Sequence, residues 1–221
     1  MNVLVIGASR GIGLEFVRQY RATGDGVWAT ARSEEGLAAL RALGATAIAL
    51  DVASAESASR LGWQIEGLHF DTVLVCAGVY GPRTSGLQAP TEAEFDAVMH
   101  TNVLGPMRVI PQLADALAPG AKLAVLSSRM GAIGARTSTS GWLYRASKAA
   151  VNSVLKDASI ALAGRAVCVS FHPGWVQTDM GGAGAELPVQ DSVAGMRRVL
   201  SGLASTDNGR FLNHDGSAID W

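Results

Sequence analysis

Short apolar runs of strand length alternate along the whole chain with longer segments of helical spacing. The strand-length runs cover 3–6, 27–31, 45–50, 72–76, 123–126, 167–171 and 211–212. The helical segments cover 14–22, 34–43, 55–65, 92–116, 143–163 and 189–203. Because the strands are apolar without interruption, both of their faces should be buried, as in a parallel sheet covered by helices on both sides. The pattern therefore predicts a doubly wound α/β fold with a seven-stranded, mostly parallel sheet.

The chain shows no break in composition, no repeat and no low-complexity tract that would mark a second domain. Its 221 residues are 48% hydrophobic and 17% charged, which is enough apolar material for one large core. We therefore expect a single domain over residues 1–221. In parallel sheets with right-handed crossovers, functional loops lie beyond the carboxyl ends of the strands.

A glycine-rich turn, Gly7-Ala8-Ser9-Arg10-Gly11-Ile12-Gly13, follows the first apolar run and opens the first helical segment. Glycine allows a positive φ and lets a phosphate approach the backbone without meeting a Cβ atom. The helix that follows offers free N–H groups and the positive end of its dipole to an anion. The segment predicts a dinucleotide-binding turn of the Rossmann type, although a glycine-rich turn by itself also occurs as an ordinary turn.

The charge balance and the cysteine count restrict the choice of partner and compartment. A formal net charge of −1 offers no basic surface for nucleic acid or an anionic membrane, so we expect a small-molecule partner. Cys76 and Cys168 lie within separate apolar runs and show no metal-ligand spacing, which favours core packing in a reducing compartment and no metal site. No apolar run approaches the ~18 residues of a membrane span. These features together predict a cytoplasmic protein.

Tyr144 and Lys148 stand four residues apart in a long helical segment, so they share one helical face. A neighbouring ammonium group favours the phenolate and lowers the tyrosine pKa from its reference value near ~10, which suits proton transfer. The alternative is an ordinary pair on the surface of a helix.

Two further polar positions lie where a ligand is expected. Ser127 and Ser128 end the fifth apolar run, where a hydroxyl can contact a substrate carbonyl or merely close the strand. Asn102 lies inside a helical segment, where asparagine is mildly unfavourable and often marks a kink or a side chain with another task. Simple tolerance in the helix is the alternative for Asn102.

In their order and spacing these residues resemble the short-chain dehydrogenase/reductase family over almost the whole chain. The resemblance rests on the glycine turn, Asp51, Cys76-Ala77-Gly78, Asn102, Ser128, Tyr144 with Lys148, and Pro173-Gly174 with Thr178. Within the family, the segments 172–180 and 211–221 look like those of the C-factor and sniffer-type carbonyl reductases. A departure stands at Cys76, where many members have asparagine.

The resemblance implies an oxidoreductase that moves hydride between a nicotinamide and a carbonyl or alcohol. Tyr144 would be the general acid or base, and Lys148 would hold the nicotinamide ribose and lower the tyrosine pKa. Ser128 would polarise the carbonyl, and Asn102 would support a proton relay to Lys148. The resemblance also implies a cofactor-binding set made of Gly7, Ser9, Arg10, Gly11, Ile12, Gly13, Arg32, Asp51, Val52, Ala77, Gly78, Pro173, Gly174, Val176 and Thr178.

The charges near the second strand predict NADP(H) rather than NAD(H). NAD-binding folds place an acid about 20 residues beyond the glycine turn, on the adenosine ribose. Here Arg32 follows Gly13 by 19 residues, and Arg10 lies inside the turn itself. Two guanidinium groups favour a 2′-phosphate. The alternatives are two solvated arginines, or an Arg32 that pairs with Glu34 or Glu35.

The substrate and the assembly are less clearly indicated. Apolar residues beside the catalytic and cofactor segments suggest a hydrophobic substrate, although each is also compatible with ordinary packing: Met130, Ile133, Trp142, Trp175 and Met180. The helical segment 143–162 is apolar or small nearly all round, which predicts a homodimer or homotetramer. A non-catalytic NAD(P)-binding sensor or signalling protein on the same fold is the alternative function.

Overall fold

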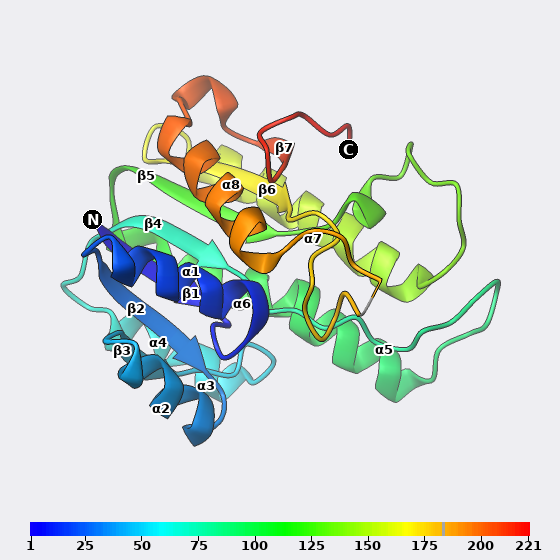
Figure 1. Cartoon of the computed structure of the whole chain (residues 1–221), viewed down its shortest axis with the longest axis horizontal. Helices are drawn as coiled ribbons and strands as arrows, with labels where there is room; N and C mark the ends of the chain where they lie inside the picture. The colour runs from blue at the N-terminus through cyan, green and yellow to red at the C-terminus, as the bar shows by residue number, and fades with distance from the viewer. Residues whose placement is uncertain (183) are drawn as a thin grey trace.

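Seven strands form one sheet in the order β3-β2-β1-β4-β5-β6-β7, and every strand pairing is parallel (Figure 1). The computed structural model describes residues 1–182 and 184–221. The strands are β1 Asn2–Ile6, β2 Gly26–Ala31, β3 Thr46–Ala49, β4 Phe70–Val75, β5 Leu117–Leu126, β6 Ala166–His172 and β7 Arg210–Asn213. The predicted fold class is confirmed, and the sheet is parallel throughout.

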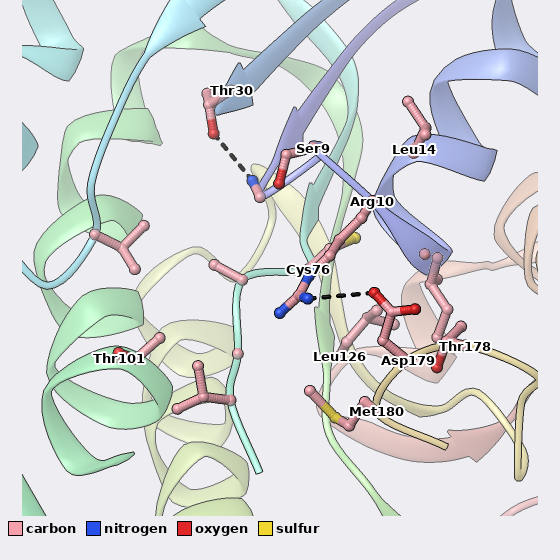
Figure 2. Close-up of a pocket in the computed structure, with 18 of the residues that line it drawn as sticks. Ser9, Arg10, Leu14, Thr30, Cys76, Thr101, Leu126, Thr178, Asp179 and Met180 are labelled. Atoms are coloured by element: carbon pink, nitrogen blue, oxygen red, sulfur yellow. Dashed lines mark hydrogen bonds and ion pairs between the residues drawn. The ribbon is translucent and has the colours of Figure 1, made fainter. Parts of the chain in front are cut away.

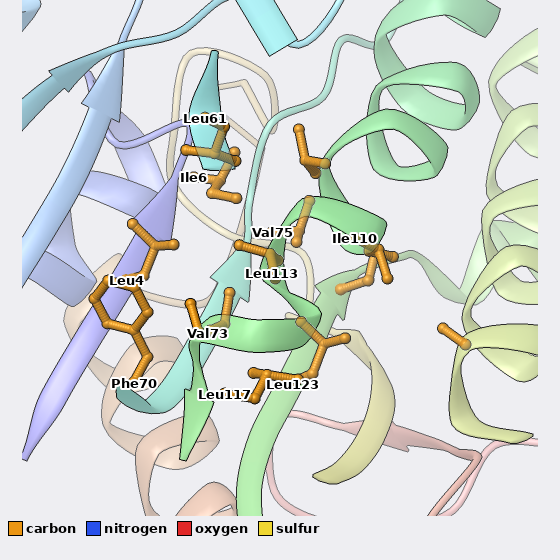
Figure 3. Packing of buried hydrophobic residues seen from close by; sticks show 14 of the residues in the cluster. Leu4, Ile6, Leu61, Phe70, Val73, Val75, Ile110, Leu113, Leu117 and Leu123 are labelled. Carbon is orange, nitrogen blue, oxygen red and sulfur yellow. The ribbon is translucent and has the colours of Figure 1, made fainter. Parts of the chain in front are cut away.

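Helices cover both faces of the sheet. They are α1 Gly11–Ala22, α2 Glu34–Ala42, α3 Ala55–Ser59, α4 Leu61–Gln64, α5 Glu92–Met99, α6 Gly105–Leu113, α7 Trp142–Ala161 and α8 Val189–Gly202. Buried residues of α1, α2 and α8 pack with one face of the sheet. Buried residues of α3, α4, α6 and α7 pack with the other face, part of which Figure 3 shows. The central strands β1, β4 and β6 are buried on both sides over most of their length, as their uninterrupted apolar sequence predicts, whereas the edge strand β3 is partly exposed.

The helical segment predicted over residues 92–116 is divided in two. A π-helical turn, His100–Leu104, separates α5 from α6, and the N–H of Gly105 bonds to the oxygen of His100. Pro106 explains the break, since a proline ring clashes with the carbonyl one turn earlier in a regular α-helix. Gly105 has a packing reason as well, because a Cβ there would lie 2.9 Å from the side chain of Val52. The turn carries Asn102 into the interior.

Strand β5 begins six residues earlier than the apolar run predicts, at Leu117 rather than Leu123. The early part contains Pro119 and Gly120, and its register with β4 shifts between Phe70 and Thr72. A bulged start of this kind breaks the apolar pattern on which the sequence prediction depends. Among the described helices, none is long and apolar enough to cross a bilayer.

Candidate dinucleotide cleft and catalytic cluster

A cleft of about 450 Å³ opens at the carboxyl ends of the strands and crosses the point where the strand order reverses between β1 and β4 (Figure 2). It brings together most of the predicted cofactor residues, which come from loops after five different strands. Those in its lining are Gly7, Ser9, Arg10, Gly11, Ile12, Gly13, Arg32, Asp51, Val52, Ala77, Gly78, Pro173 and Thr178. The predicted Gly174 and Val176 lie in the same loop as Pro173 but outside this lining.

The glycine turn folds back tightly on the end of β1. A Cβ at Gly13 would lie 2.2 Å from the carbonyl oxygen of Gly7, and one at Gly7 would lie 2.6 Å from the backbone of Ala77. Gly7 also has a φ of +83°, a conformation that favours glycine. The N–H of Gly7 donates a 2.9 Å hydrogen bond to the hydroxyl of Thr30. These contacts hold the start of α1 close to the end of β1. Because the turn is made largely of glycine, its backbone faces the cleft without side chains.

The N-terminus of α1 is open to an anion. Arg10 stands at the N-cap, its side chain accepts no hydrogen bond from the helix, and no acidic side chain lies in the first turn. The residues around the start of the helix, Arg10 to Leu14, all line the cleft. Free first-turn N–H groups beside a bare glycine backbone fit a pyrophosphate in charge and in shape.

The two arginines that predict a 2′-phosphate both border the cleft, but their surroundings differ. Arg10 pairs with Asp179 at 3.3 Å, and both side chains are exposed (Figure 2). Arg32 is exposed, and no ion pair to it occurs within the described part of the chain. Glu34, one of the two acids that were alternatives for Arg32, pairs with Arg41 at 2.6 Å. Arg32 is therefore available to an anionic ligand.

Tyr144 and Lys148 extend from one face of α7 into the same cleft as the glycine turn. Both are buried, and the Lys148 ammonium lies 5.5 Å from the centroid of the Tyr144 ring. The Lys148 Nζ donates a 2.8 Å hydrogen bond to the carbonyl oxygen of Leu126 at the end of β5. Ser127, which follows β5, also lines the cleft. The surface-pair alternative therefore does not describe these two residues.

Ser128 lies beside Tyr144 rather than in the lining itself. Its hydroxyl accepts a 3.1 Å hydrogen bond from the N–H of Met130 and caps a short 3-10 turn. The hydroxyl is close enough to the Tyr144 phenol for hydrogen bonding to lower the pKa of that phenol. Phenol, ammonium and hydroxyl therefore converge at one end of the cleft.

Burial dominates the ionisation of the cluster. It raises the pKa of Tyr144 well above its ordinary value, and the nearby Tyr80 raises it further, whereas Ser128 acts in the opposite direction. Burial also lowers the pKa of Lys148 to about 8, and the Cys76 thiol only partly offsets that effect. This differs from the expectation that Lys148 lowers the tyrosine pKa. Burial disfavours the phenolate, and Lys148 is not among the groups that lower the pKa of Tyr144.

The side chain of Asn102 fixes the loop that follows β4 by hydrogen bonds. Its amide oxygen accepts a 2.8 Å hydrogen bond from the N–H of Val79, and its amide nitrogen donates to the oxygen of Val79 at 2.8 Å. The same nitrogen donates to the hydroxyl of Ser147 in α7 at 2.9 Å. The side chain therefore links the loop to the helix that carries Tyr144 and Lys148, and a Cβ at Gly78 would lie 3.5 Å from the Lys148 Nζ.

The predicted substrate-pocket residues are not gathered into this lining. Met180 borders the cleft, whereas Met130, Ile133, Trp142 and Trp175 lie outside its lining. Ile133 is 65% exposed. Trp175 is exposed too, and its indole N–H donates to the oxygen of Gly181 within its own loop. That these residues line a substrate pocket remains a prediction.

Three residues of this region were not found from the sequence. Thr30 supports the glycine turn, Asp179 pairs with Arg10, and the Tyr80 ring stacks on the Tyr144 ring with 4.6 Å between centroids. Thr30 carried a signal, since it is a polar residue inside an apolar strand. Asp179 and Tyr80 act through contacts between distant segments, which the local pattern does not reveal.

Comparison with known proteins identifies relatives of the same construction. A family model described as short chain dehydrogenase matches residues 1–186. The C-signal protein of Myxococcus xanthus is 45% identical over 132 residues, which cover 58% of this chain and 80% of that protein.

Solved structures agree with this result over the full length. The carbonyl reductase Sniffer of D. melanogaster superposes with a TM-score of 0.92 at 28% identity, covering 100% of this chain and 99% of that one. A carbonyl reductase from Pseudomonas aeruginosa PAO1 in complex with NADP superposes with a TM-score of 0.87 at 31% identity, with the same coverage. The expected likeness to C-factor and sniffer-type carbonyl reductases is confirmed.

Proposed function

Because the chain belongs to the short-chain dehydrogenase/reductase family, we propose that it is an NADP(H)-dependent oxidoreductase acting on a carbonyl compound or a secondary alcohol, with Tyr144 as proton donor. One observation carries the proposal: Tyr144 and Lys148 line the same cleft as the glycine turn. A binding protein needs the turn, but only a catalyst needs a buried phenol and a buried ammonium group beside it.

The lining of the cleft supports a dinucleotide as the ligand. The glycine backbone and the start of α1 accept the pyrophosphate, Asp51 and Val52 flank the adenosine side, and Ala77 with Gly78 forms the wall near Lys148. Lys148 would hold the ribose hydroxyls on the nicotinamide side, because its ammonium retains donors beyond the one used on Leu126. When bound, the nicotinamide supplies the hydride that the protein itself cannot supply.

The protein residues provide the proton and the polarisation. Tyr144 is protonated at neutral pH, and burial raises its pKa further, so its hydroxyl holds the proton that a carbonyl oxygen would take up. The Ser128 hydroxyl lies beside it and can hydrogen-bond the same oxygen. Lys148 carries a positive charge below about pH 8, which stabilises negative charge developing on that oxygen.

The preference for NADP(H) rests on Arg32 and Arg10, which border the cleft beyond β2 and within the glycine turn. The ribose side of the cleft presents a guanidinium group where an acid would select NAD(H). The Pseudomonas aeruginosa relative was crystallised with NADP, which agrees with this choice.

A second candidate is a cofactor-binding signalling protein without turnover, which the likeness to C-signal favours. The Tyr144→Phe variant separates the two. With NADPH and a panel of ketones, aldehydes and quinones, the wild type should oxidise NADPH, and Tyr144→Phe should bind NADPH with unchanged affinity but turn nothing over. Tyr20→Phe is the control, because Tyr20 is a buried tyrosine outside the cleft lining. Turnover by Tyr144→Phe would contradict the proposal, and binding without turnover by the wild type would favour signalling.

We also propose that the protein is a homodimer or homotetramer formed through α7. The exposed residues of this helix include Ala146, Ser153 and Ile160, so small and apolar side chains remain uncovered for a second copy. Light scattering at micromolar concentration tests this assembly, and a monomer would contradict it.

A further inference from the structure

Tyr80 stacks its ring on the ring of Tyr144. The centroids are 4.6 Å apart and the planes differ by 22°, which is an offset-stacked aromatic pair. Tyr80 comes from the loop after β4, whereas Tyr144 comes from the first turn of α7. The contact therefore joins the loop after β4 to the start of α7, and it covers one face of the Tyr144 ring.

The position of Tyr80 is fixed by backbone that only glycine can supply. Gly141 precedes α7 with a φ of +62°, and a Cβ there would lie 2.5 Å from the Tyr80 hydroxyl oxygen. The N–H of Gly141 donates a 3.0 Å hydrogen bond to the oxygen of Thr84, farther along the same loop. The loop and the helix start are thus tied together on both sides of the stacked rings.

Arg83 holds Tyr80 from another direction. Its guanidinium carbon lies 5.0 Å from the centroid of the Tyr80 ring, within the range of a cation–π contact. The same guanidinium donates a 3.0 Å hydrogen bond to the backbone oxygen of Met180, which borders the cleft. A continuous set of contacts therefore runs from the loop after β6, through Arg83 and Tyr80, to Tyr144.

We propose that Tyr80 is a positioning residue that fixes the Tyr144 phenol for proton donation and keeps water from its ring. The inference rests on the proposed function, since it assigns to Tyr80 a task that matters only if Tyr144 donates a proton. The side chain of Tyr144 has two rotatable bonds, and its hydroxyl must meet a carbonyl oxygen within hydrogen-bond distance. A flat ring packed at van der Waals distance restricts the tilt of the phenol without using a hydrogen bond.

Two substitutions at Tyr80 and one elsewhere test this role. Tyr80→Leu removes the flat ring and keeps an apolar side chain, and Tyr80→Phe keeps the ring and removes only the hydroxyl. Tyr20→Leu is the matched control, because Tyr20 also stacks on an aromatic ring, Phe16, and lies under a guanidinium group, that of Arg197 at 4.2 Å. It lies in the core between α1, α8 and the sheet, away from the cleft lining.

The kinetic expectation is a split between kcat and binding. Tyr80→Leu should lower kcat about ten- to a hundredfold, the scale of a misplaced catalytic group, while the Kd for NADPH stays at the wild-type value. Tyr80→Phe, which keeps the ring, should have a kcat near the wild-type value. Tyr20→Leu should lower the melting temperature and leave kcat of the folded protein unchanged.

A carbon NMR titration supplies a second readout, because the chain has three tyrosines and their Cζ resonances can be resolved. In Tyr80→Leu the Tyr144 resonance should titrate at lower pH than in the wild type, since water reaches the ring. The other groups facing Tyr144 remain in this variant, Lys148 on α7 and Ser128 after β5, and so does Cys76, which acts on Lys148.

The outcomes separate this inference from the proposed function. If Tyr144→Phe is inactive and Tyr80→Leu keeps wild-type kcat and an unchanged Tyr144 titration, the role of Tyr80 is wrong and the proposed function stands. If Tyr80→Phe lowers kcat as far as Tyr80→Leu does, the hydroxyl rather than the stacked ring matters, and the inference fails too. If Tyr144→Phe remains active, both fail.

Discussion

The guanidinium of Arg10 lies 3.3 Å from the carboxylate of Asp179, across 169 residues of sequence. The pair connects the glycine turn after β1 to the loop after β6 at the edge of the cleft (Figure 2). Both side chains are exposed, 68% and 79%, so the pair contributes little to folding. It places an acid beside an arginine that the proposed cofactor needs.

Replacing that acid should therefore strengthen cofactor binding. Asp179→Asn removes a competitor for Arg10 and a like charge near the phosphates, so NADPH should bind about two- to fivefold more tightly, the range of an exposed ion pair. Fluorescence titration at low salt measures the change, and high salt should reduce it. Weaker or equal NADPH binding by Asp179→Asn would contradict this competition.

Arg32 should determine the choice between the two nicotinamide cofactors. In Arg32→Ala, kcat/KM with NADPH should fall about ten- to a hundredfold, the loss of a charged hydrogen bond, while kcat/KM with NADH stays nearly constant. Steady-state kinetics with both cofactors provides the measurement. Arg60→Ala is the control, because Arg60 is an exposed arginine that pairs with Glu56 outside the cleft lining. Equal losses with NADH and NADPH would show that Arg32 does not contact a 2′-phosphate.

Lys148 should reduce the stability of the cofactor-free protein. Its pKa is about 8 in the folded state against an ordinary value of 10.5, so the unfolded chain holds its proton more tightly. Stability from this group is present above pH 10.5 and is lost as the pH falls through about 8, where the buried charge costs about 3 kcal/mol. A variant without this lysine would also lose the hydrogen bond from the Lys148 Nζ to the oxygen of Leu126, which offsets about 1 kcal/mol of the gain.

Lys148→Met should therefore raise the free energy of unfolding at pH 7 by about 2 kcal/mol and abolish turnover. Urea unfolding at several pH values measures the difference, which should shrink as the pH rises from about 8 towards 10.5. A variant that is less stable than the wild type at pH 7 would show that the buried ammonium group is compensated.

Gly13 should not tolerate a side chain, in contrast to a glycine on the surface of the same fold. A Cβ at Gly13 would lie 2.2 Å from the backbone oxygen of Gly7, so Gly13→Ala should cost about 1–3 kcal/mol and weaken NADPH binding. Gly202, at the end of α8, has nothing within 4 Å of such a Cβ. Gly202→Ala should therefore leave NADPH binding unchanged and slightly raise the melting temperature. Thermal unfolding and NADPH titration compare the two variants. Equal melting temperatures and equal NADPH affinities would contradict the tight packing of the glycine turn.

The elements of the fold could be predicted because their causes are local. Each parallel strand is an apolar run, and the glycine turn carries its geometry in its own residues, so both are visible in a single window of sequence. The break at His100–Leu104 was not predicted, although Pro106 signals it. The helical spacing of apolar positions continues through Pro106, and that spacing alone does not show how the chain accommodates the proline ring.

The contacts that complete the site depend on distant segments. Nothing near Tyr144 in the sequence indicates that Tyr80 lies on its ring, because α5, α6 and β5 separate the two residues along the chain. The direction of the Tyr144 pKa shift was missed for the same reason. A spacing of four residues shows that an ammonium is near, but the degree of burial that outweighs it follows only from tertiary packing.

The reversal of strand order between β1 and β4 has a practical consequence for protein engineering. Arg32 follows β2 on one side of that reversal, whereas Tyr80 and Tyr144 follow β4 and β5 on the other. The proposed contact to a 2′-phosphate and the proposed proton donor therefore lie in separate halves of the polypeptide. If the proposed function holds, a library that randomises the residues after β2 should change the coenzyme preference and leave Tyr80 and Tyr144 in place.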